Sequence, residues 1–212
     1  MPQAAPGSPL RIGIFGGAFD PPHLAHRALA EAAIGQLSLD RLHILPTGQA
    51  WHKPRTLTDG EHRLAMCQLA FGDMPEVHVD DRELRRPSAT YTIDTLEEFR
   101  RENPDALFFL VVGEDQLQAF RTWRRWQDVL CMATLVVAGR PDAKGDSHLS
   151  AVPSGVGEVP FLRLMLPLSP ASSTDIRARL ADPARHSAGL ATLVPEAVAG
   201  YISNHSLYLQ PS

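Results

Sequence analysis

The stretch RIGIFGGAFDPPHLAH, residues 11–26, decides the fold of this chain. Its first five residues form a mostly apolar run, typical of a short buried strand, and Gly16-Gly17 ends that run. Apolar residues at helical spacing then predict a helix over residues 24–36. A strand that passes into a helix through a pair of glycines is the opening unit expected of a parallel α/β fold.

Strand and helix patterns alternate along the rest of the chain. The expected strands cover residues 41–45, 76–79, 107–112, 133–138 and 161–166, and the expected helices cover residues 61–71, 92–101, 172–180 and 195–205. This order predicts an α/β fold, a Rossmann-like doubly wound parallel sheet with helices on both faces. Because ligands of such sheets bind beyond the carboxyl ends of the strands, functional motifs should follow strands.

Composition and charge limit the class of protein. The 212 residues are 44% hydrophobic and 21% charged, as in a folded globular domain, and the net charge of −4 argues against a nucleic-acid partner. No stretch approaches the ~18 apolar residues that a membrane span requires. We therefore expect a cytoplasmic protein without a membrane partner, with Cys67 and Cys131 as reduced thiols in its core.

The two ends of the chain differ in their expected order. Residues 1–9 are rich in proline and alanine and lack a basic start, so we expect a disordered N-terminal arm rather than a signal peptide. Residues 10–212 should form a single domain, with a surface excursion at residues 141–160.

The turn after the first strand carries residues suited to phosphate chemistry. Gly16 and Gly17 allow a bulky anion to approach the backbone closely, and Asp20 before two prolines indicates a helix start. His23 and His26 are three residues apart, so both imidazoles can lie on one face of the first helical turn. Unpaired N–H groups at that turn attract phosphate, and imidazoles are readily charged beside it. A pair of surface histidines is one alternative interpretation, and a metal site is another, although no third ligand lies at convincing spacing.

A second helix start with similar chemistry lies near the far end of the chain. Ser172, Ser173 and Thr174 follow the strand expected at residues 161–166, and Arg177 adds a fixed positive charge. Hydroxyl and N–H groups at a helix start can bind an anion. An ordinary serine cap on a helix is the alternative interpretation.

These motifs resemble those of a known superfamily. The pattern GGxFxPxHxxH at residues 16–26 resembles the HxGH signature of nucleotidyltransferases, with Ala25 in place of the glycine. Residues 172–177 resemble the second phosphate motif of that superfamily, with Ala171 in place of isoleucine. More narrowly, the segments at residues 81–92 and 122–123 look like those of the bacterial nicotinate-nucleotide adenylyltransferase family, and the likeness extends over residues 11–208.

The resemblance implies a single nucleotidyltransferase domain that joins the adenylyl group of ATP to nicotinate mononucleotide, giving nicotinate adenine dinucleotide and pyrophosphate in NAD biosynthesis. It implies catalytic roles for His23, His26 and Arg177. It implies ATP contacts for Gly16, Gly17, Phe19, His52, Lys53, Gly113, Asp115, Ser172, Ser173 and Thr174, and mononucleotide contacts for Ala18, Tyr91, Thr92 and Trp123. Mg²⁺ would accompany ATP as co-substrate and share in neutralising the phosphates.

The pyridine ring of the acceptor poses a specificity question. Trp123 would stack on the ring, as the resemblance implies, whether the ring carries a carboxylate or a carboxamide. No lysine or arginine stands out in the segments around Tyr91 and Thr122. We therefore expect backbone N–H groups at helix starts to receive the nicotinate carboxylate.

Other functions stay open on the sequence alone. The acceptor could be nicotinamide mononucleotide or phosphopantetheine, although phosphopantetheine-specific chains are shorter and lack the Tyr91 and Trp123 features. A truncated class I aminoacyl-tRNA synthetase core would need a KMSKS-like segment, and residues 172–177 stand in that place. A non-catalytic nucleotide-binding module is the remaining alternative.

Overall fold

A parallel sheet in the order β3-β2-β1-β4-β5-β6 forms the centre of the molecule. The computed structural model describes residues 8–48, 57–139, 159–166, 171–182 and 189–209. The strands are β1 (Arg11–Gly17), β2 (Arg41–Pro46), β3 (Val77–Val79), β4 (Leu107–Gly113), β5 (Thr134–Gly139) and β6 (Leu162–Met165). The direction of winding reverses between β1 and β4, so the predicted doubly wound, Rossmann-like sheet is confirmed.

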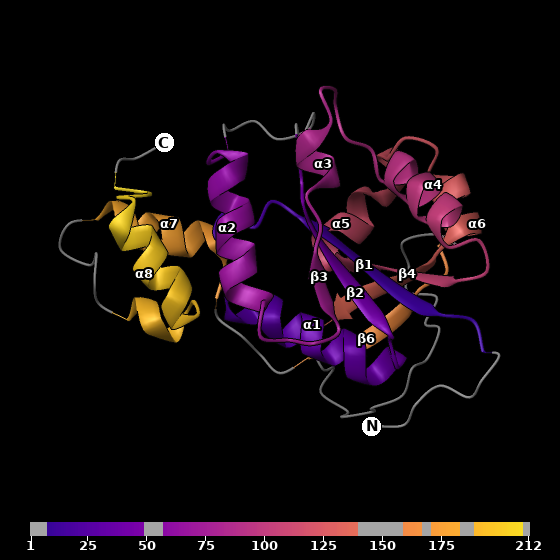
Figure 1. The fold of residues 1–212 in the computed structure, drawn as a ribbon, viewed down its shortest axis with the longest axis horizontal. Helices are drawn as coiled ribbons and strands as arrows, with labels where there is room; N and C mark the ends of the chain where they lie inside the picture. Colours follow the sequence, from indigo (N-terminus) through magenta and orange to yellow (C-terminus); the bar gives the residue numbers. More distant parts are fainter. Residues whose placement is uncertain (1–7, 49–56, 140–158, 167–170, 183–188, 210–212) are drawn as a thin grey trace.

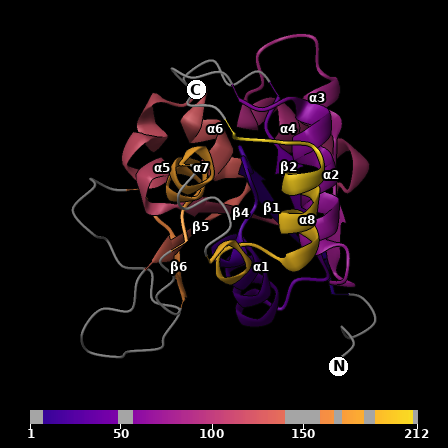
Figure 2. The same cartoon turned by 90° about the vertical axis from the view of Figure 1, so that its left-hand side faces the viewer.

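Helices cover both faces of this sheet (Figures 1 and 2). One face is covered by α1 (Leu24–Leu37), α2 (Gly60–Phe71), α7 (Ser173–Ala181) and α8 (Glu196–Asn204). The other is covered by α4 (Thr92–Glu102), α5 (Glu114–Ala119) and α6 (Trp126–Met132). The short elements are α3 (Arg82–Arg85), η1 (Phe120–Thr122) and η2 (Leu190–Thr192).

The strands divide the core into two layers, because successive side chains of a strand point to opposite faces. Phe109 and Val111 of β4 pack in the layer that contains α1, α2 and α8. Phe108, Leu110 and Val112 pack in the layer that contains α4 and α6. Each of these five side chains is at most 5% exposed, as expected of an unbroken apolar strand with helices on both sides.

The predicted elements are all present, with ends that differ by no more than two residues. The predicted helix ranges did not include α3, α5 or α6, because helices of four to seven residues are too short to show a helical period. Most of the predicted N-terminal arm lies outside the described residues, as does most of the excursion at residues 141–160. Across the parts of the chain that the structure describes, no helix is long and apolar enough to span a membrane.

The two cysteines lie in different environments. Cys67 is buried in the core as predicted, but the prediction for Cys131 is wrong, because its side chain is exposed. Val129 is the buried residue of α6. A residue two positions further along a helix points away from that face, so Cys131 faces outward.

Candidate active site

A cavity of about 300 Å³ lies at the carboxyl ends of β1 and β4. These ends flank the point where the winding of the sheet reverses, which is the usual place for a ligand in this fold. A Cβ atom placed on Gly16 or Gly113 would meet nothing within 4 Å, so both turns leave open space. The cavity brings together several of the predicted residues: Gly16, Gly17, Ala18, His26, Tyr91, Thr92, Gly113 and Trp123.

His26 lies in the cavity wall with its ring orientation fixed. Its Nδ1 accepts a hydrogen bond of 3.2 Å from the backbone N–H of His23. A neutral ring that accepts at Nδ1 carries its proton on Nε2, so His26 is set up as an Nε2–H donor. The rings of His23 and His26 stack with centroids 3.7 Å apart, which confirms the shared face expected from their spacing.

His23 is the more buried of the two histidines. His23 is 6% exposed, and burial lowers the pKa of its imidazole to about 4. Its Nδ1 has no hydrogen-bond partner within the described parts of the chain. The sequence predicts imidazoles that are readily charged, whereas burial keeps His23 neutral at pH 7.

Several N–H groups at the start of α1 already have protein partners. The N–H of Leu24 donates to the carbonyl of Leu193 at 2.9 Å, and that of His26 donates to the carbonyl of His23 at 2.9 Å. The N–H of His23 bonds His26, as described above. These donors are engaged, so this turn offers fewer unpaired N–H groups than the sequence predicted.

Asp20 anchors the turn between β1 and α1. Its side chain is fully buried and accepts hydrogen bonds from the hydroxyl of Tyr208 at 2.7 Å and from the N–H of Thr58 at 3.3 Å. Burial raises the pKa of Tyr208, so its hydroxyl keeps the proton that it donates. Arg63, which is 3% exposed, donates to the carbonyls of Ala18 and Thr58 at 3.0 and 2.8 Å.

The start of α7 is bonded directly to that turn. The hydroxyl of Ser173 donates to the carbonyl of Pro21 at 2.9 Å. Arg177 donates to the carbonyl of Asp20 at 2.7 Å and to the hydroxyl of Thr174 at 3.2 Å. The fold therefore brings the two phosphate-type motifs together, although about 150 residues separate them in the sequence.

Ser172 has the role of an ordinary helix cap. Its Oγ accepts from the N–H of Asp175 at 3.1 Å and lies 2.7 Å from the Asp175 carboxylate. The alternative interpretation of Ser172, a serine cap on a helix, is thus confirmed.

The opposite wall of the cavity is aromatic. Tyr91 precedes the first residue of α4, Thr92, and Trp123 packs against Phe120 with ring centroids 5.2 Å apart. The hydroxyl of Thr122 donates to the carbonyl of Ala119 at 2.7 Å, so Thr122 closes the turn that presents Trp123. A flat ring could stack against this wall, as predicted for Trp123.

A buried carboxyl group faces the same cavity. Glu83 is 7% exposed, and burial raises its pKa to about 7. Its Oε1 accepts a hydrogen bond of 2.9 Å from Thr95, whose hydroxyl in turn accepts from Arg86 at 2.7 Å. At neutral pH this group is therefore near the midpoint of its titration.

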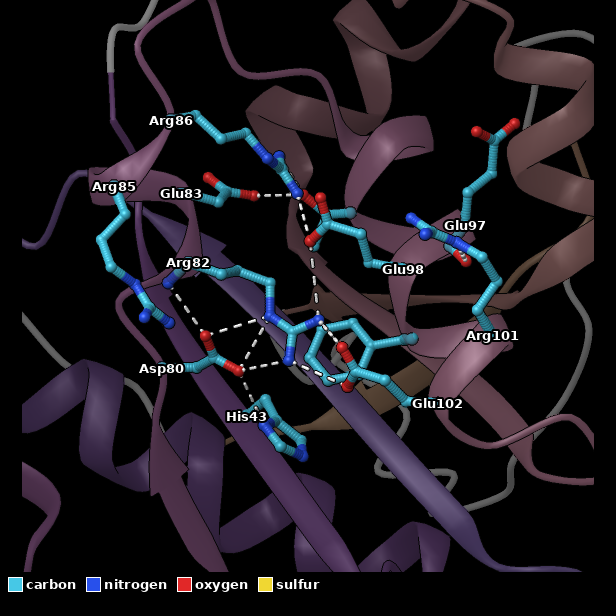
Figure 3. Close-up of polar contacts among 12 residues, drawn as sticks. His43, Asp80, Arg82, Glu83, Arg85, Arg86, Glu97, Glu98, Arg101 and Glu102 are labelled. Atoms are coloured by element: carbon cyan, nitrogen blue, oxygen red, sulfur yellow. Dashed lines mark hydrogen bonds and ion pairs between the residues drawn. The ribbon is translucent and has the colours of Figure 1, made fainter.

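Two arginines, Arg82 at the start of α3 and Arg86 just after its end, pair with acidic side chains of α4 (Figure 3). Arg82 pairs with Asp80 at 2.8 Å and with Glu102 at 3.0 Å. Glu98 of α4 is shared, since it lies 2.7 Å from Arg86 and 3.6 Å from Arg82. These ion pairs fix the position of the segment that leads to Tyr91.

Other predicted residues lie apart from the cavity or outside the described chain. Phe19 is 1% exposed and packs edge-on against Phe15 and Phe71, so a ligand could reach only its backbone. Asp115 is exposed in the first turn of α5, one residue before the cavity residue Gln116. His52 and Lys53 lie outside the described residues.

Arg63, Tyr208 and Glu83 are among the residues of this site that sequence reasoning missed. Arg63 has the pattern of a solvated position on α2, and Tyr208 lies in a tail without a motif. Glu83 belongs to the segment at residues 81–92, where the resemblance pointed to the family but gave it no role. Contacts between distant parts of the chain produce all three roles, so no local signal reveals them.

Metal ligands are a further point of comparison with the predicted chemistry. Within the described ranges, no group of three or more His, Cys, Asp or Glu side chains is arranged to hold a metal ion. The protein groups gathered at the cavity are mainly donors and hydroxyls, which suit phosphate oxygens better than a divalent cation.

Sequence comparisons identify related proteins over nearly the whole chain. Residues 14–179 match the family described as cytidylyltransferase-like. A protein of Albidiferax ferrireducens named "Probable nicotinate-nucleotide adenylyltransferase" is 50% identical over 198 residues, which cover 93% of this chain and 98% of that protein. A protein of the same name from Methylibium petroleiphilum is 41% identical over 203 residues, covering 95% and 93%.

The fold has close counterparts among solved structures. The nicotinic acid mononucleotide adenylyltransferase of Plasmodium falciparum, complexed with APC, superposes with a TM-score of 0.73 at 19% identity. The superposition covers 94% of this chain and 97% of that one, which shows a shared fold. With the sequence relatives at 50% and 41% identity, the chain belongs to the nicotinate-nucleotide adenylyltransferase family.

Proposed function

We propose that this enzyme transfers the adenylyl group of ATP to nicotinate mononucleotide, giving nicotinate adenine dinucleotide and pyrophosphate in NAD biosynthesis. The contact between the two helix starts carries the proposal: Arg177 and Ser173 of the second motif bond the carbonyls of Asp20 and Pro21 in the first. This contact supports the proposal because it joins the start of α7 to the turn that leads to His26, which lines a cavity that also contains Tyr91 and Trp123.

The reaction needs no general base on the enzyme. A mononucleotide phosphate is largely a dianion at neutral pH, because its second pKa is about 6. One of its oxygens attacks the α-phosphorus of ATP, and a new P–O bond forms there. The bond between that phosphorus and the oxygen bridging to the β-phosphorus breaks, and pyrophosphate leaves with the electron pair.

The enzyme's part is positioning and charge stabilisation. His26 would donate from Nε2 to a phosphate oxygen, since its Nδ1 is engaged by the His23 backbone. His23 would enter as a neutral ring, and a bound polyphosphate would raise its pKa from about 4. Arg177 would add a fixed positive charge between the two motifs.

The remaining proposed ATP contacts involve several chain segments. They are the backbone at Gly16, Gly17, Phe19 and Gly113, the side chains of His52, Lys53 and Asp115, and the α7 start at Ser172, Ser173 and Thr174. Mg²⁺ belongs to the proposal as the companion of ATP, bound through the phosphates. The proposal places the enzyme in the cytoplasm, without a nucleic-acid or membrane partner.

Pyrophosphate release tests the reaction and the acceptor together. The enzyme is mixed with ATP and Mg²⁺ and with nicotinate mononucleotide, nicotinamide mononucleotide, phosphopantetheine or no acceptor. We expect the fastest release with nicotinate mononucleotide and a product with the mass of nicotinate adenine dinucleotide. Fastest release with phosphopantetheine, or none with either pyridine nucleotide, would refute the proposal. Release with the nicotinamide nucleotide alone would keep the chemistry and change the acceptor.

A further inference from the structure

Arg124 lies in the wall of the cavity, next to the residue proposed to stack on the pyridine ring. It is the one Lys or Arg among the described residues that line the cavity. Its guanidinium carbon lies 4.7 Å from the centroid of the Tyr91 ring. Trp123, Arg124 and Tyr91 thus combine two aromatic surfaces with a fixed positive charge. From the sequence, backbone N–H groups alone are predicted to receive the carboxylate, and Arg124 is not among the predicted residues.

The charge of Arg124 has no anionic partner among the described residues, whereas that of its neighbour does. Arg125 pairs with Glu97 at 2.8 Å and with Asp128 at 2.6 Å. The guanidinium of Arg124 contacts the Tyr91 ring. Within the described chain, the N–H groups of Arg124 have no protein acceptor. A guanidinium placed at a cavity in this way can pair with a carboxylate of a ligand.

We propose that Arg124 binds the carboxylate of the nicotinate ring and thereby sets the preference for nicotinate over nicotinamide mononucleotide. The proposal rests on the function proposed above. Arginine has five N–H donors and no acceptor. A carboxylate can accept from two of them in parallel, whereas the NH₂ group of a carboxamide meets them with a donor.

The carboxyl group of Glu83 increases the need for a positive charge to bind the nicotinate carboxylate in this cavity. Its carboxyl group lines the same space, and a second carboxylate brought in by the ligand would be repelled by the ionised form. A positive charge in the wall offsets that repulsion for the acid and offers little to the neutral amide. The pair therefore discriminates between the two substrates by charge as well as by hydrogen-bond direction.

A cation that merely covers Tyr91 is the competing explanation for Arg124. A surface cation–π contact orders an aromatic side chain but does not distinguish an acid from an amide. The two explanations therefore predict different ratios of kcat/KM between nicotinate and nicotinamide mononucleotide, whereas total activity does not distinguish them. The test needs that ratio, measured with a charge-preserving variant and a neighbouring control.

The experiment compares the wild type with Arg124→Gln, Arg124→Lys and Arg125→Gln. The kcat/KM for each mononucleotide is measured at saturating ATP and Mg²⁺, and thermal melting checks the fold. We expect Arg124→Gln to lower kcat/KM for nicotinate mononucleotide about tenfold and to change that for the amide by less than twofold. Arg124→Lys should keep part of the preference. Arg125→Gln removes the same charge one residue away and should leave the ratio unchanged.

Two results would overturn the proposal: an unchanged ratio in Arg124→Gln, or an equal loss for both substrates. If the wild type turns over neither mononucleotide, the proposed function fails, and calorimetric titration decides the role of Arg124 separately. In that titration, a wild-type preference for nicotinate mononucleotide that disappears in Arg124→Gln supports the proposal. Any other pattern of binding refutes it.

Discussion

The two sides of the cavity are held in different ways. On the side of the phosphate motifs, most of the contacts described run from side chains to backbone carbonyls: Ser173 to Pro21, Arg177 to Asp20 and Arg63 to Ala18. The hydroxyl of Tyr208, which bonds the Asp20 carboxylate, is the exception among them. On the side of the aromatic wall, side chains bond each other, as in the ion pairs of Arg82 and Arg86 with Glu98 (Figure 3).

This difference suggests a division of tasks. A bond to a backbone carbonyl depends on one side chain, so the partner cannot be lost by substitution. That suits the geometry of phosphate transfer, where small misplacements are costly. An ion pair between side chains depends on two residues, so substitution of either residue can change it. That suits a wall that determines which acceptor is bound.

The largest effect should come from the stacked histidines of the phosphate side. We expect His26→Ala to lower kcat by ~10²-fold, as loss of a donor to a developing charge typically does. His23→Ala should cost a similar factor, because the ring that stacks on His26 is removed. The exposed His78→Ala serves as the control for loss of an imidazole. Activity of both site variants within threefold of the wild type would exclude these histidines from the reaction.

A smaller loss should follow when the C-terminal contact to Asp20 is removed. Tyr208→Phe deletes the donor to a fully buried carboxylate, which should lower the free energy of unfolding by about 1–3 kcal/mol. The shift of the turn should lower kcat by about tenfold. Urea unfolding and steady-state kinetics measure both effects.

Tyr201→Phe is the matched control for this variant, since it removes a hydroxyl that contacts His62 on the α2–α8 side, away from the cavity. It should cost less in stability and leave kcat unchanged. Equal effects of the two substitutions would show that the Asp20 contact has no special part in the site.

The aromatic wall should respond in substrate affinity rather than in turnover. Arg86→Gln breaks the ion pair with Glu98 and the hydrogen bond to Thr95, which should raise the KM for the mononucleotide about threefold to tenfold. The KM for ATP should change by less than twofold. Arg85→Gln, with an exposed side chain paired to Asp81, is the control at the adjacent position, the last residue of α3. A rise in the KM of ATP equal to that of the mononucleotide would contradict the division between the two sides.

The fold could be predicted from the sequence alone, but only part of the candidate site could. The run at residues 107–112 predicts a buried strand because its consecutive residues are all apolar, which is typical of a strand covered on both faces. Both phosphate motifs follow strands, so the sequence places both at the carboxyl edge of the sheet. Their contact is not implied by the sheet order, because β4 and β5 separate β1 from β6. By contrast, Tyr208 reaches Asp20 across 188 positions, and Arg124 is one of several arginines in its segment. Only the folded chain distinguishes these residues from ordinary surface positions.

The smallest effect on turnover, and the one with the clearest pH signature, should come from Glu83→Gln. Burial raises the pKa of Glu83 from its ordinary value of 4.5 to about 7. The hydrogen bond from Thr95 and the charge of Arg86 oppose this rise, whereas Asp80 and Glu98 reinforce it. Between pH 4.5 and 7 the folded state therefore holds a proton that the unfolded state has released. The free energy of unfolding must fall as the pH rises through this window, by at most about 1.4 kcal/mol per pH unit.

The glutamine variant lacks this proton, so its unfolding free energy relative to the wild type should increase from pH 5 to pH 7 and level off above. Denaturant unfolding at several pH values measures this difference in unfolding free energy between variant and wild type. The contributions of the other titrating groups are common to both proteins and cancel in the difference. The same protonation should appear in binding, because an ionised Glu83 repels the nicotinate carboxylate. The wild-type KM for nicotinate mononucleotide should rise between pH 6 and 8, and that of Glu83→Gln should stay level. Parallel stability curves for the two proteins would show that Glu83 has an ordinary pKa and that the acidity of the cavity plays no part in acceptor choice.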